Sequence, residues 1–474
     1  MRAQHSATYG GHMRNGDVSF WHSTTGPLAI RPPLPGDRDA DIAIVGGGLT
    51  GLWSAYYLAE RLPDARIVVL EREFCGFGAS GRNGGWLSAE VAGNRRTYAA
   101  VAESRGRDGL DANRRLTATM RSGVDEVLDR ITNESIECDA VKSGVLHIAR
   151  CAAQDARLRA EIEHEEHLGG RWEYLDDVAV TERITVAGAR SAMYSSQCAR
   201  VNPAKLTRGV ADAVARRGVQ IFEDTTVTGI GPRRVDTDRG VVRAESILVC
   251  LEGFTATMPG THRKLLPMNS SMIVTEPVDD EIWDRIGWGG CELLGETAHA
   301  YTYSQRTADG RIALGGRGVP YRFGSGIDDR GRTQERTTAS LITALHEMFP
   351  ATADTPIAHT WCGVLGVSRD WSASICYDPV TGIGSASGYV GSGLTTTNVA
   401  GRTLCDLVAG DRTDLTDLPW VGHRTRNWEP EPLRWLGVAT MYAAYRTADR
   451  RELADGSSRT NVIARMADRV SGRS

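Results

Sequence analysis

The sequence predicts an α/β fold with a parallel sheet, interrupted by a second, α+β domain whose sheet is mostly antiparallel. Three observations predict it: an apolar run that leads into spaced glycines, an alternation of strand-like and helical segments, and two later glycine-rich turns. The 474 residues suffice for two or three domains of about 150 residues each. A composition with 41% hydrophobic and 24% charged residues is typical of a soluble globular protein.

The first observation is the segment 41–51, which reads Asp-Ile-Ala-Ile-Val-Gly-Gly-Gly-Leu-Thr-Gly. Its apolar part fits a buried parallel strand. Gly46, Gly48 and Gly51 have the GxGxxG spacing, in which they permit a tight turn, let the backbone approach a pyrophosphate and bring the helix close to the strand. A helix over 52–61 would then direct its N-terminal amides and dipole at the phosphates.

A second strand over 67–70 leads into Glu71, whose carboxylate can accept hydrogen bonds from an adenosine ribose. A lone GxGxxG is weakly specific. Strand, glycines, helix, strand and acid in this order predict a Rossmann-like dinucleotide site.

Two further glycine-rich segments indicate which dinucleotide binds. Residues 76–86 allow a backbone turn that lies flat against a ligand. Residues 388–398 precede a helix expected over 399–407, whose N-terminus would stabilise negative charge on the pyrimidine edge of a reduced flavin. Taken alone, the first fits a flexible surface loop and the second a plain turn. Together they favour FAD over NAD, because FAD is long and its ring must be held far from the adenine.

With residues 201–206, Val-Asn-Pro-Ala-Lys-Leu, these segments resemble the D-amino-acid oxidase superfamily of FAD-dependent oxidoreductases. Glycine oxidase and sarcosine oxidase are members, and the resemblance is strongest to the gamma-glutamylputrescine oxidase-like branch. It covers about residues 20–415. The resemblance implies FAD, a two-domain fold and oxidation of a C–N bond.

The resemblance also implies which residues bind FAD. The first segment would hold the pyrophosphate, Arg72 and Val227 would lie near the adenine, and Gly84 and Gly85 near the reactive N5 edge. The full expected set is Gly46, Gly48, Leu49, Thr50, Gly51, Glu71, Arg72, Gly78, Ala79, Ser80, Arg82, Asn83, Gly84, Gly85, Trp86, Val227, Gly391, Gly393, Leu394 and Thr395. No metal is expected.

The implied reaction passes a hydride equivalent from the carbon beside an amine nitrogen to flavin N5. Water hydrolyses the imine, and dioxygen is reduced to hydrogen peroxide. An FAD-dependent amine dehydrogenase with a non-oxygen acceptor is the alternative; an NAD-dependent dehydrogenase and a flavin-binding protein without catalysis are further ones. No residue has a clear general-base signature, and none is obligatory if the amine arrives neutral.

The substrate pocket is expected in the second domain. Arg317 is the first choice for binding an acidic group, because its planar fork fits a carboxylate or phosphonate, although a structural salt bridge explains it as well. His147, Trp361 and Trp371 have core packing as an alternative role. The whole set of candidates is His147, Met272, Tyr301, Tyr303, Arg317, Trp361 and Trp371.

Two places depart from the family pattern. Some relatives of sarcosine oxidase bind FAD covalently through a cysteine, and Cys362 lies in that general region with a poor spacing match. Noncovalent FAD and a plain buried cysteine are therefore expected. Residues 249–253, Val-Cys-Leu-Glu-Gly, stand where relatives often carry small residues, which leaves the flavin contact there open.

Charge and hydropathy exclude several other classes of protein. A net charge of −4 without a long basic run does not support nucleic-acid binding. No apolar stretch reaches the roughly 18 residues that span a bilayer. The first 40 residues lack a signal-like apolar core, so a cytoplasmic location is expected. The nine scattered cysteines are expected to be reduced and mostly buried.

The predicted domain organisation is discontinuous. Residues 241–243 and 247–251 are expected as separate strands, Trp21 as an anchor of the N-terminal arm, and a helix over 430–453 as packing on the body. The boundaries are an arm at 1–38, an FAD-binding domain at 39–95, 196–260 and 358–415, a substrate domain at 96–195 and 261–357, and a helical tail at 416–474.

Overall fold

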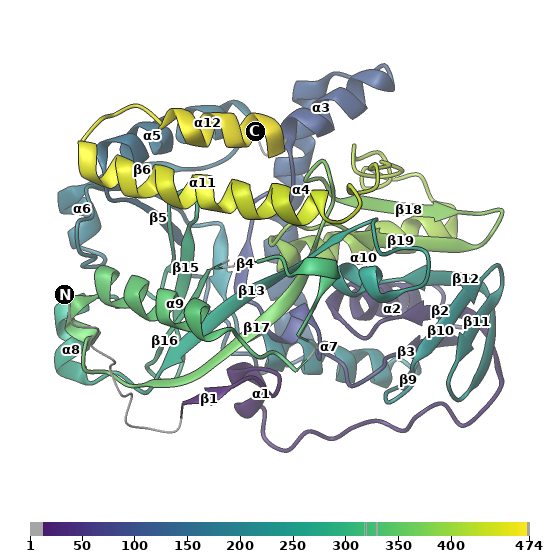
Figure 1. Cartoon of the computed structure of the whole chain (residues 1–474). Coiled ribbons are helices and arrows are strands. Elements are labelled where there is room, and N and C mark those ends of the chain that lie inside the picture. Colours follow the sequence, from purple (N-terminus) through teal and green to yellow (C-terminus); the bar gives the residue numbers. More distant parts are fainter. Residues whose placement is uncertain (1–12, 317, 319, 329, 472–474) are drawn as a thin grey trace.

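The computed structural model describes residues 13–316, 318, 320–328 and 330–471, and two large sheets dominate it (Figure 1). The eight-stranded sheet has the order β10-β11-β12-β2-β3-β9, with β19 beside β12 and β18 beside β19. Its strands β2, β3, β9, β12 and β19 run parallel. The bounds are β2 Arg38–Val45, β3 Ile67–Leu70, β9 Gln220–Phe222, β10 Val227–Gly231, β11 Arg234–Thr237, β12 Gly240–Val249, β18 Ser374–Asp378 and β19 Ile383–Ser387.

The second sheet has nine strands in the order β1-β17-β13-β16-β15-β14-β5-β7-β6. Its neighbours are antiparallel except for β1 with β17 and β14 with β5. The bounds are β1 Arg14–Asn15, β5 Val145–Ala149, β6 Glu173–Asp176, β7 Ser191–Ser195, β13 Leu266–Thr275, β14 Leu293–Glu296, β15 Thr302–Arg306, β16 Ile312–Gly316 and β17 Ile357–Val367. A parallel sheet plus a mostly antiparallel one confirms the predicted fold class.

Helices cover both sheets and enclose the main cores. Residues of α2, α4, α7 and α10 share one core with β2 and β3, while α8 and α9 pack on the nine-stranded sheet. Helix α7 begins where the sequence indicates, because Asn202 accepts a hydrogen bond from Lys205 N at 3.2 Å and Pro203 fills the first position. The bounds are α1 Phe20–Ser23, α2 Leu49–Arg61, α3 Arg95–Ser104, α4 Gly109–Asn133, α5 Ala152–His167, α6 Asp177–Thr181, α7 Pro203–Arg216, α8 Asp280–Ile286, α9 Glu335–Met348, α10 Gly393–Ala409, α11 Leu433–Asp455 and α12 Val462–Ser471.

Three details differ from the sequence-based expectation. The two strands predicted over 241–251 are one continuous strand, β12, because Ala244 and Ser246 are buried on either side of the exposed Glu245 and keep the two-residue alternation. Residues 358–367, assigned by the sequence to the FAD-binding domain, form most of β17 and pair with β13 in the nine-stranded sheet. The helix predicted over 399–407 begins earlier, at Gly393. The remaining domain boundaries stay a prediction.

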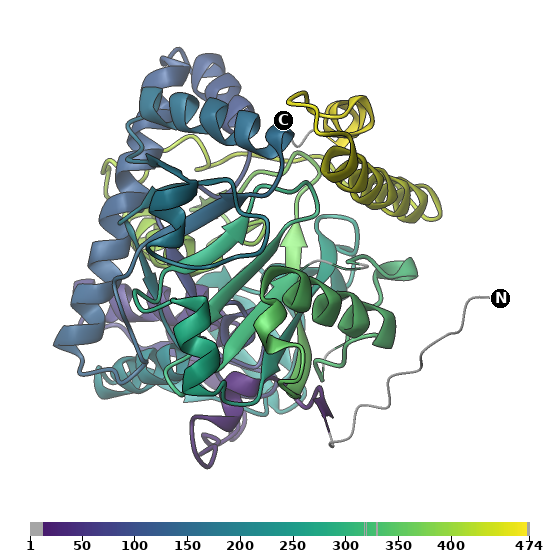
Figure 2. The ribbon, with the colours of Figure 1, turned by 90° about the vertical axis from the view of Figure 1, so that its left-hand side faces the viewer.

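Both ends of the described chain pack on the body. Trp21 is 2% exposed, and β1 pairs with β17. Figure 2 shows α11 and α12 together at one margin of the body. Within α11, Val438, Tyr442 and Tyr445 are buried, whereas Leu433 and Leu436 are exposed.

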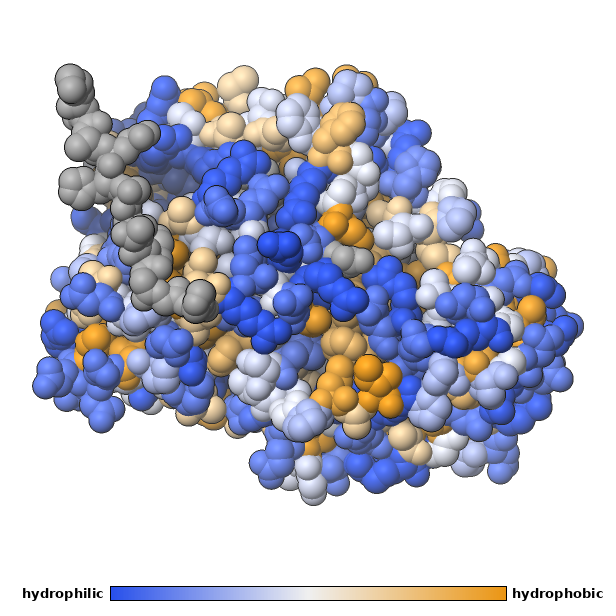
Figure 3. All heavy atoms as spheres, turned by 60° about the horizontal axis from the view of Figure 1, so that its bottom comes forward, coloured by the Kyte–Doolittle hydropathy of each residue, from blue (hydrophilic) through white to orange (hydrophobic). Residues whose placement is uncertain are grey.

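The surface in Figure 3 is mostly hydrophilic, with apolar side chains in small separate groups. In the part of the chain that the structure describes, every helix is too short or too polar to cross a membrane. The cytoplasmic location stays a prediction.

Candidate active site

A cavity of about 820 Å³ is lined by residues of both sheets. Most of the expected cofactor-binding residues lie on its wall, and Gly51, Gly85 and Thr395 do not. The lining members are Gly46, Gly48, Leu49, Thr50, Glu71, Arg72, Gly78, Ala79, Ser80, Arg82, Asn83, Gly84, Trp86, Val227, Gly391, Gly393 and Leu394.

The glycines after β2 are required by close contacts. Gly46 has φ +110°, and a Cβ there would lie 2.6 Å from Cys250 O. A Cβ on Gly51 would lie 2.1 Å from Gly46 O, so a side chain there would push α2 away from the turn. At Gly48 a Cβ would approach only the Ser80 side chain, at 3.1 Å. The backbone at Gly48 is thus open on the cavity side, which fits a pyrophosphate at the start of α2.

Glu71 is held at the end of β3 by backbone amides. Its carboxylate accepts hydrogen bonds from Gly47 N at 2.7 Å and Glu73 N at 3.0 Å. Burial raises the pKa of Glu71, although these two amides oppose the rise. Arg72 packs beside it against the Phe77 ring, 5.7 Å from the centroid. The acid and the arginine therefore line the cavity next to the glycine turn.

The second glycine segment forms a short 3₁₀ turn, η1 (Ala79–Gly81). Hydrogen bonds to neighbouring segments hold this turn in place. Ser80 Oγ accepts a hydrogen bond from Leu49 N at 2.9 Å, which joins this turn to α2. Arg82 is 2% exposed and donates to Phe77 O at 2.6 Å. Trp361 Nε1 donates to Arg82 O at 2.9 Å. Trp361, a pocket candidate, is thus fully buried behind the loop and away from the cavity wall.

The third segment positions the start of α10. Gly391 has φ +113°, in the region that favours glycine, and the first helical residue, Gly393, has open space around it. Thr395 is buried and donates from Oγ1 to Ser88 O at 2.7 Å. Thr395 therefore ties α10 to the last residue of β4 (Trp86–Ser88), and it does not line the cavity.

Glu252 is a charged residue on the cavity wall that the sequence pattern did not single out. Its carboxylate accepts hydrogen bonds from Gly388 N and Tyr389 N, both at 3.0 Å, and from Gly366 N. Burial raises the pKa of Glu252 to about 7, against the opposing effect of these amides. The only signal in the sequence was the departure from small residues at 249–253.

A row of residues across the nine-stranded sheet forms the wall on the substrate side. Strand pairing places His147 of β5 beside Gly295 of β14, and Gly295 beside Tyr303 of β15, which pairs with Gly315 of β16. A Cβ on Gly295 would lie 2.8 Å from His147 Nδ1, and one on Gly315 would lie 2.4 Å from the Tyr303 ring. The two glycines therefore make room for the two rings. Tyr303 also hydrogen-bonds Ser270 through its hydroxyl at 3.0 Å.

Glu90 joins this wall from the loop after β4. Its Oε1 lies 2.7 Å from His147 Nε2. Burial raises the pKa of Glu90, but the hydrogen bond and charge of His147 outweigh this effect and hold the pKa below its usual value. No spacing rule connects residues 90 and 147, because Glu90 lies in a loop and His147 in β5, and only the tertiary fold brings them together.

The other pocket candidates lie in different places. Tyr301 lines the cavity, while Met272 and Trp371 are buried in separate apolar clusters away from its wall. Arg317 lies outside the described residues. Cys362 is buried, its Sγ donates to Arg332 O at 3.4 Å, and burial raises the thiol pKa to about 11.

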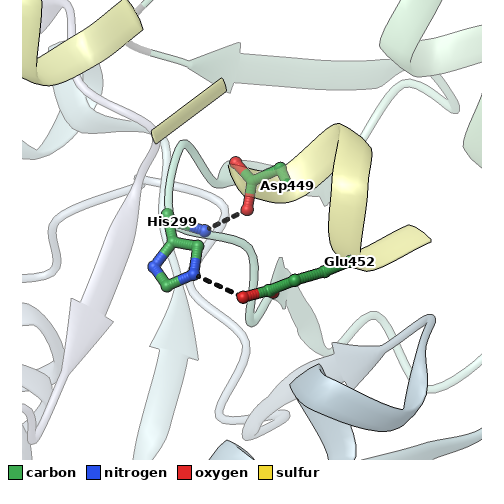
Figure 4. A group of neighbouring side chains, drawn as sticks. All are labelled: His299, Asp449 and Glu452. Carbon is green, nitrogen blue, oxygen red and sulfur yellow. Dashed lines mark hydrogen bonds and ion pairs between the residues drawn. The ribbon is translucent and has the colours of Figure 1, made fainter. Parts of the chain in front are cut away.

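A group of three ionisable residues lies next to the cavity wall, at the junction with α11 (Figure 4). The side chains of His299, Asp449 and Glu452 place potential metal-ligand atoms within 4.8 Å of one another. Their oxygens already have partners, because Asp449 accepts from His299 N at 2.8 Å and Glu452 accepts from Arg157 at 2.8 Å. These hydrogen bonds join α11 to the loop that leads to Tyr301. We call this group of three residues the α11 latch.

A glycine turn after a parallel strand, a buried acid after the next strand and a long cavity that reaches an aromatic wall define a dinucleotide-dependent oxidoreductase. The profile of the family described as FAD dependent oxidoreductase (DAO) matches residues 41–407. The chain belongs to this family, FAD is its cofactor, and it is an FAD-dependent oxidoreductase. The predicted superfamily and cofactor are confirmed.

Individual relatives agree with this assignment. Gamma-glutamylputrescine oxidoreductase of Escherichia coli is 30% identical over 86% of this chain and 94% of its own length. The structure of glycine oxidase from Geobacillus kaustophilus has a TM-score of 0.64 at 19% identity and covers 79% of this chain and 96% of its own. L-proline dehydrogenase from P. horikoshii has a TM-score of 0.66 at 18% identity, covering 82% and 98%. At such identities the two structures show a common fold only.

Proposed function

We propose that this protein oxidises a C–N bond of a small amine or amino acid and that dioxygen is the electron acceptor. The observation that carries the proposal is the cavity that connects the glycine turn at Gly46 with the wall formed by His147 and Tyr303. The amine that appears in the name of the Escherichia coli relative supports the substrate class.

The proposed roles of the residues follow from their positions. The backbone at Gly46 and Gly48 binds the pyrophosphate, and Glu71 binds the adenosine ribose. When bound, FAD supplies the acceptor for the hydride equivalent that leaves the carbon beside the amine nitrogen. The ring of Tyr303, anchored on Ser270, and the Trp86 ring, 6.1 Å away, enclose the amine and exclude water. The product is an imine, which water hydrolyses.

FAD is proposed to bind noncovalently. Cys362 has a raised pKa and a buried sulfur that donates to a backbone carbonyl, so the reactive thiolate is disfavoured. Acid precipitation of the protein should therefore release all of the flavin into the supernatant. Flavin that stays in the pellet would contradict this part of the proposal.

An FAD-dependent dehydrogenase with another electron acceptor is the second candidate. The observation behind it is that one structural neighbour, from P. horikoshii, is named L-proline dehydrogenase. The difference concerns only the reoxidation of the flavin, so the two candidates make the same prediction for substrate binding.

Anaerobic reduction of the flavin tests the proposal. The purified yellow protein is mixed without oxygen with primary and secondary amines, amino acids and diamines, and the flavin absorbance is followed. We expect bleaching with at least one amine, then reoxidation and one hydrogen peroxide per flavin when air is admitted. Bleaching that persists in air assigns the dehydrogenase, and a flavin that no amine bleaches rejects C–N oxidation.

A further inference from the structure

We propose that Glu90, oriented by His147, is a subsite for a second, non-reacting ammonium group, so that the preferred substrate is a diamine or a longer polyamine. This inference rests on the proposed function. The amine that is oxidised must present a lone pair and so cannot remain protonated. An ammonium that stays charged on Glu90 therefore belongs to a different nitrogen of the same molecule.

The geometry gives Glu90 a fixed position on the cavity wall. His147 Nε2 lies 2.7 Å from Glu90 Oε1, which leaves Oε2 for another donor. The His147 ring is held between Trp86, at 6.0 Å, and Trp172, at 5.6 Å. The exposed fractions of the side chains are 32% for Glu90 and 17% for His147, so the carboxylate is the more accessible of the two.

Glu90 has His147 as a partner at one carboxylate oxygen, whereas the other charged groups of the described cavity wall are compensated by other partners or lie elsewhere. Glu71 and Glu252 accept hydrogen bonds from backbone amides. Glu296 accepts from Thr302 Oγ1 at 2.9 Å and lies 3.9 Å from Arg150.

The arginines of the described wall do not offset the charge of Glu90. Arg72 follows Glu71, and Arg82 is buried beneath η1, where it donates to Phe77 O. Among the described lining residues, Glu90 is therefore the acid that a cation in the substrate end of the cavity can reach.

Two aromatic rings favour the same ligand. Trp86 and Tyr303 line the cavity with their ring centroids 6.1 Å apart, and a cation above either ring is attracted by its quadrupole. The carboxylate and the two ring faces together fit a cationic chain.

The test compares putrescine with pentylamine, which has the same length and a methyl group in place of the second amine. For the wild-type holoenzyme we expect kcat/KM for putrescine to exceed that for pentylamine by about 10- to 100-fold, as for a hydrogen bond to a charged group. The variant Glu90→Gln should lose most of this ratio, because kcat/KM falls more for putrescine than for pentylamine. Glu90→Asp, which retains the charge, should keep part of it.

The control is Glu173→Gln, which removes an exposed acid of β6 in the same sheet, outside the cavity wall. It should leave the ratio unchanged. Flavin content and melting temperature of each variant show that folding is intact. A wild-type enzyme without preference for putrescine, or a Glu90→Gln variant that retains the preference, overturns the inference.

Direct binding separates this inference from the proposed function. If no amine bleaches the flavin, C–N oxidation fails, and binding of putrescine and pentylamine to the holoenzyme is measured by equilibrium dialysis. Tighter binding of putrescine that Glu90→Gln abolishes supports the subsite independently of catalysis. Equal binding of the two amines rejects it.

Discussion

Glu252 combines two features that are unfavourable for an isolated residue. Its backbone φ is 45°, in the left-handed region, and its carboxylate is buried. Both are compensated locally, because the left-handed turn lets one carboxylate accept hydrogen bonds from the amides of Gly388, Tyr389 and Gly366. The residue thereby links the end of β12 to the turn that precedes α10.

This position predicts a specific pH dependence. The pKa of Glu252 is raised from 4.5 to about 7, so between these values the folded state binds more protons than the unfolded state. Stability contributed by Glu252 therefore falls as pH rises from 4.5 to 7, by about 3 kcal/mol, and stays constant above. Relative to Glu252→Gln, the wild-type free energy of unfolding should decrease over this window.

Urea unfolding of both proteins at pH 5, 6, 7 and 8 measures the difference. Gln cannot accept hydrogen bonds from all three amides. The free energy of unfolding of the variant is therefore lowered by a constant amount that does not depend on pH. Parallel pH profiles of the two proteins would contradict the raised pKa.

Gly51 gives a second prediction for a single residue. In Gly51→Ala the Cβ would lie 2.1 Å from Gly46 O, which is backbone and cannot rotate away. We expect loss of FAD binding and a destabilisation above about 3 kcal/mol, as for severe overpacking. The ratio of flavin to protein absorbance and the melting temperature check this.

Gly437→Ala is the matched control for Gly51→Ala. Gly437 lies in α11 and is exposed, and a Cβ added there would meet no described atom within 4 Å apart from its chain neighbours and the backbone of its own helix. Ala there should be neutral or stabilise the helix by up to about 1 kcal/mol. A Gly51→Ala variant with the flavin content of this control would contradict the packing argument.

At the scale of elements, the α11 latch connects a helix to the cavity wall. Glu452 is 1% exposed and accepts hydrogen bonds from Arg157 and from Asn461 N, at 2.8 and 2.7 Å. Asp449 accepts from His299 N and Ala300 N, directly before Tyr301. The position of Tyr301 on the cavity wall thus depends on a helix far along the chain.

Glu452→Gln should weaken this latch. It leaves Arg157 with a neutral partner, and we expect a loss of stability of about 1–3 kcal/mol. Because the loop before Tyr301 loosens, KM for the amine should rise more than kcat falls. Arg451→Gln, an exposed change on the same helix, is the control. Thermal unfolding and steady-state kinetics measure both effects, and a variant indistinguishable from the control would show that the latch is dispensable.

The sequence predicted elements whose signal is local. The turn at Gly46 depends on residues within a few positions of one another, and it was anticipated. The pairing of β17 and the contact between Glu90 and His147 join segments that are distant in the sequence, which a single sequence does not encode locally. Trp361 was predicted to form part of the substrate pocket. It instead supports the loop at Arg82, because its Nε1 donates a hydrogen bond to Arg82 O.

At the scale of the whole molecule, the cavity has walls from both sheets, so its ligand contacts both. FAD binds only the assembled state and should stabilise it by about 2.7 kcal/mol at a concentration 100 times Kd. We expect the melting temperature of the flavin-free protein to rise on addition of FAD and to stay unchanged with NAD. Differential scanning fluorimetry tests this, and an equal response to NAD would contradict the assigned specificity.

The centre of the eight-stranded sheet has a consequence for how the protein is made. Strand β12 pairs with β2, from the beginning of the chain, and its last residues, 247–249, pair with β19 near the other end. A growing chain on the ribosome therefore carries an open strand edge at these residues until β19 emerges. Unpaired edges of this kind favour aggregation, so chains interrupted before residue 383 should depend on chaperones to stay in solution.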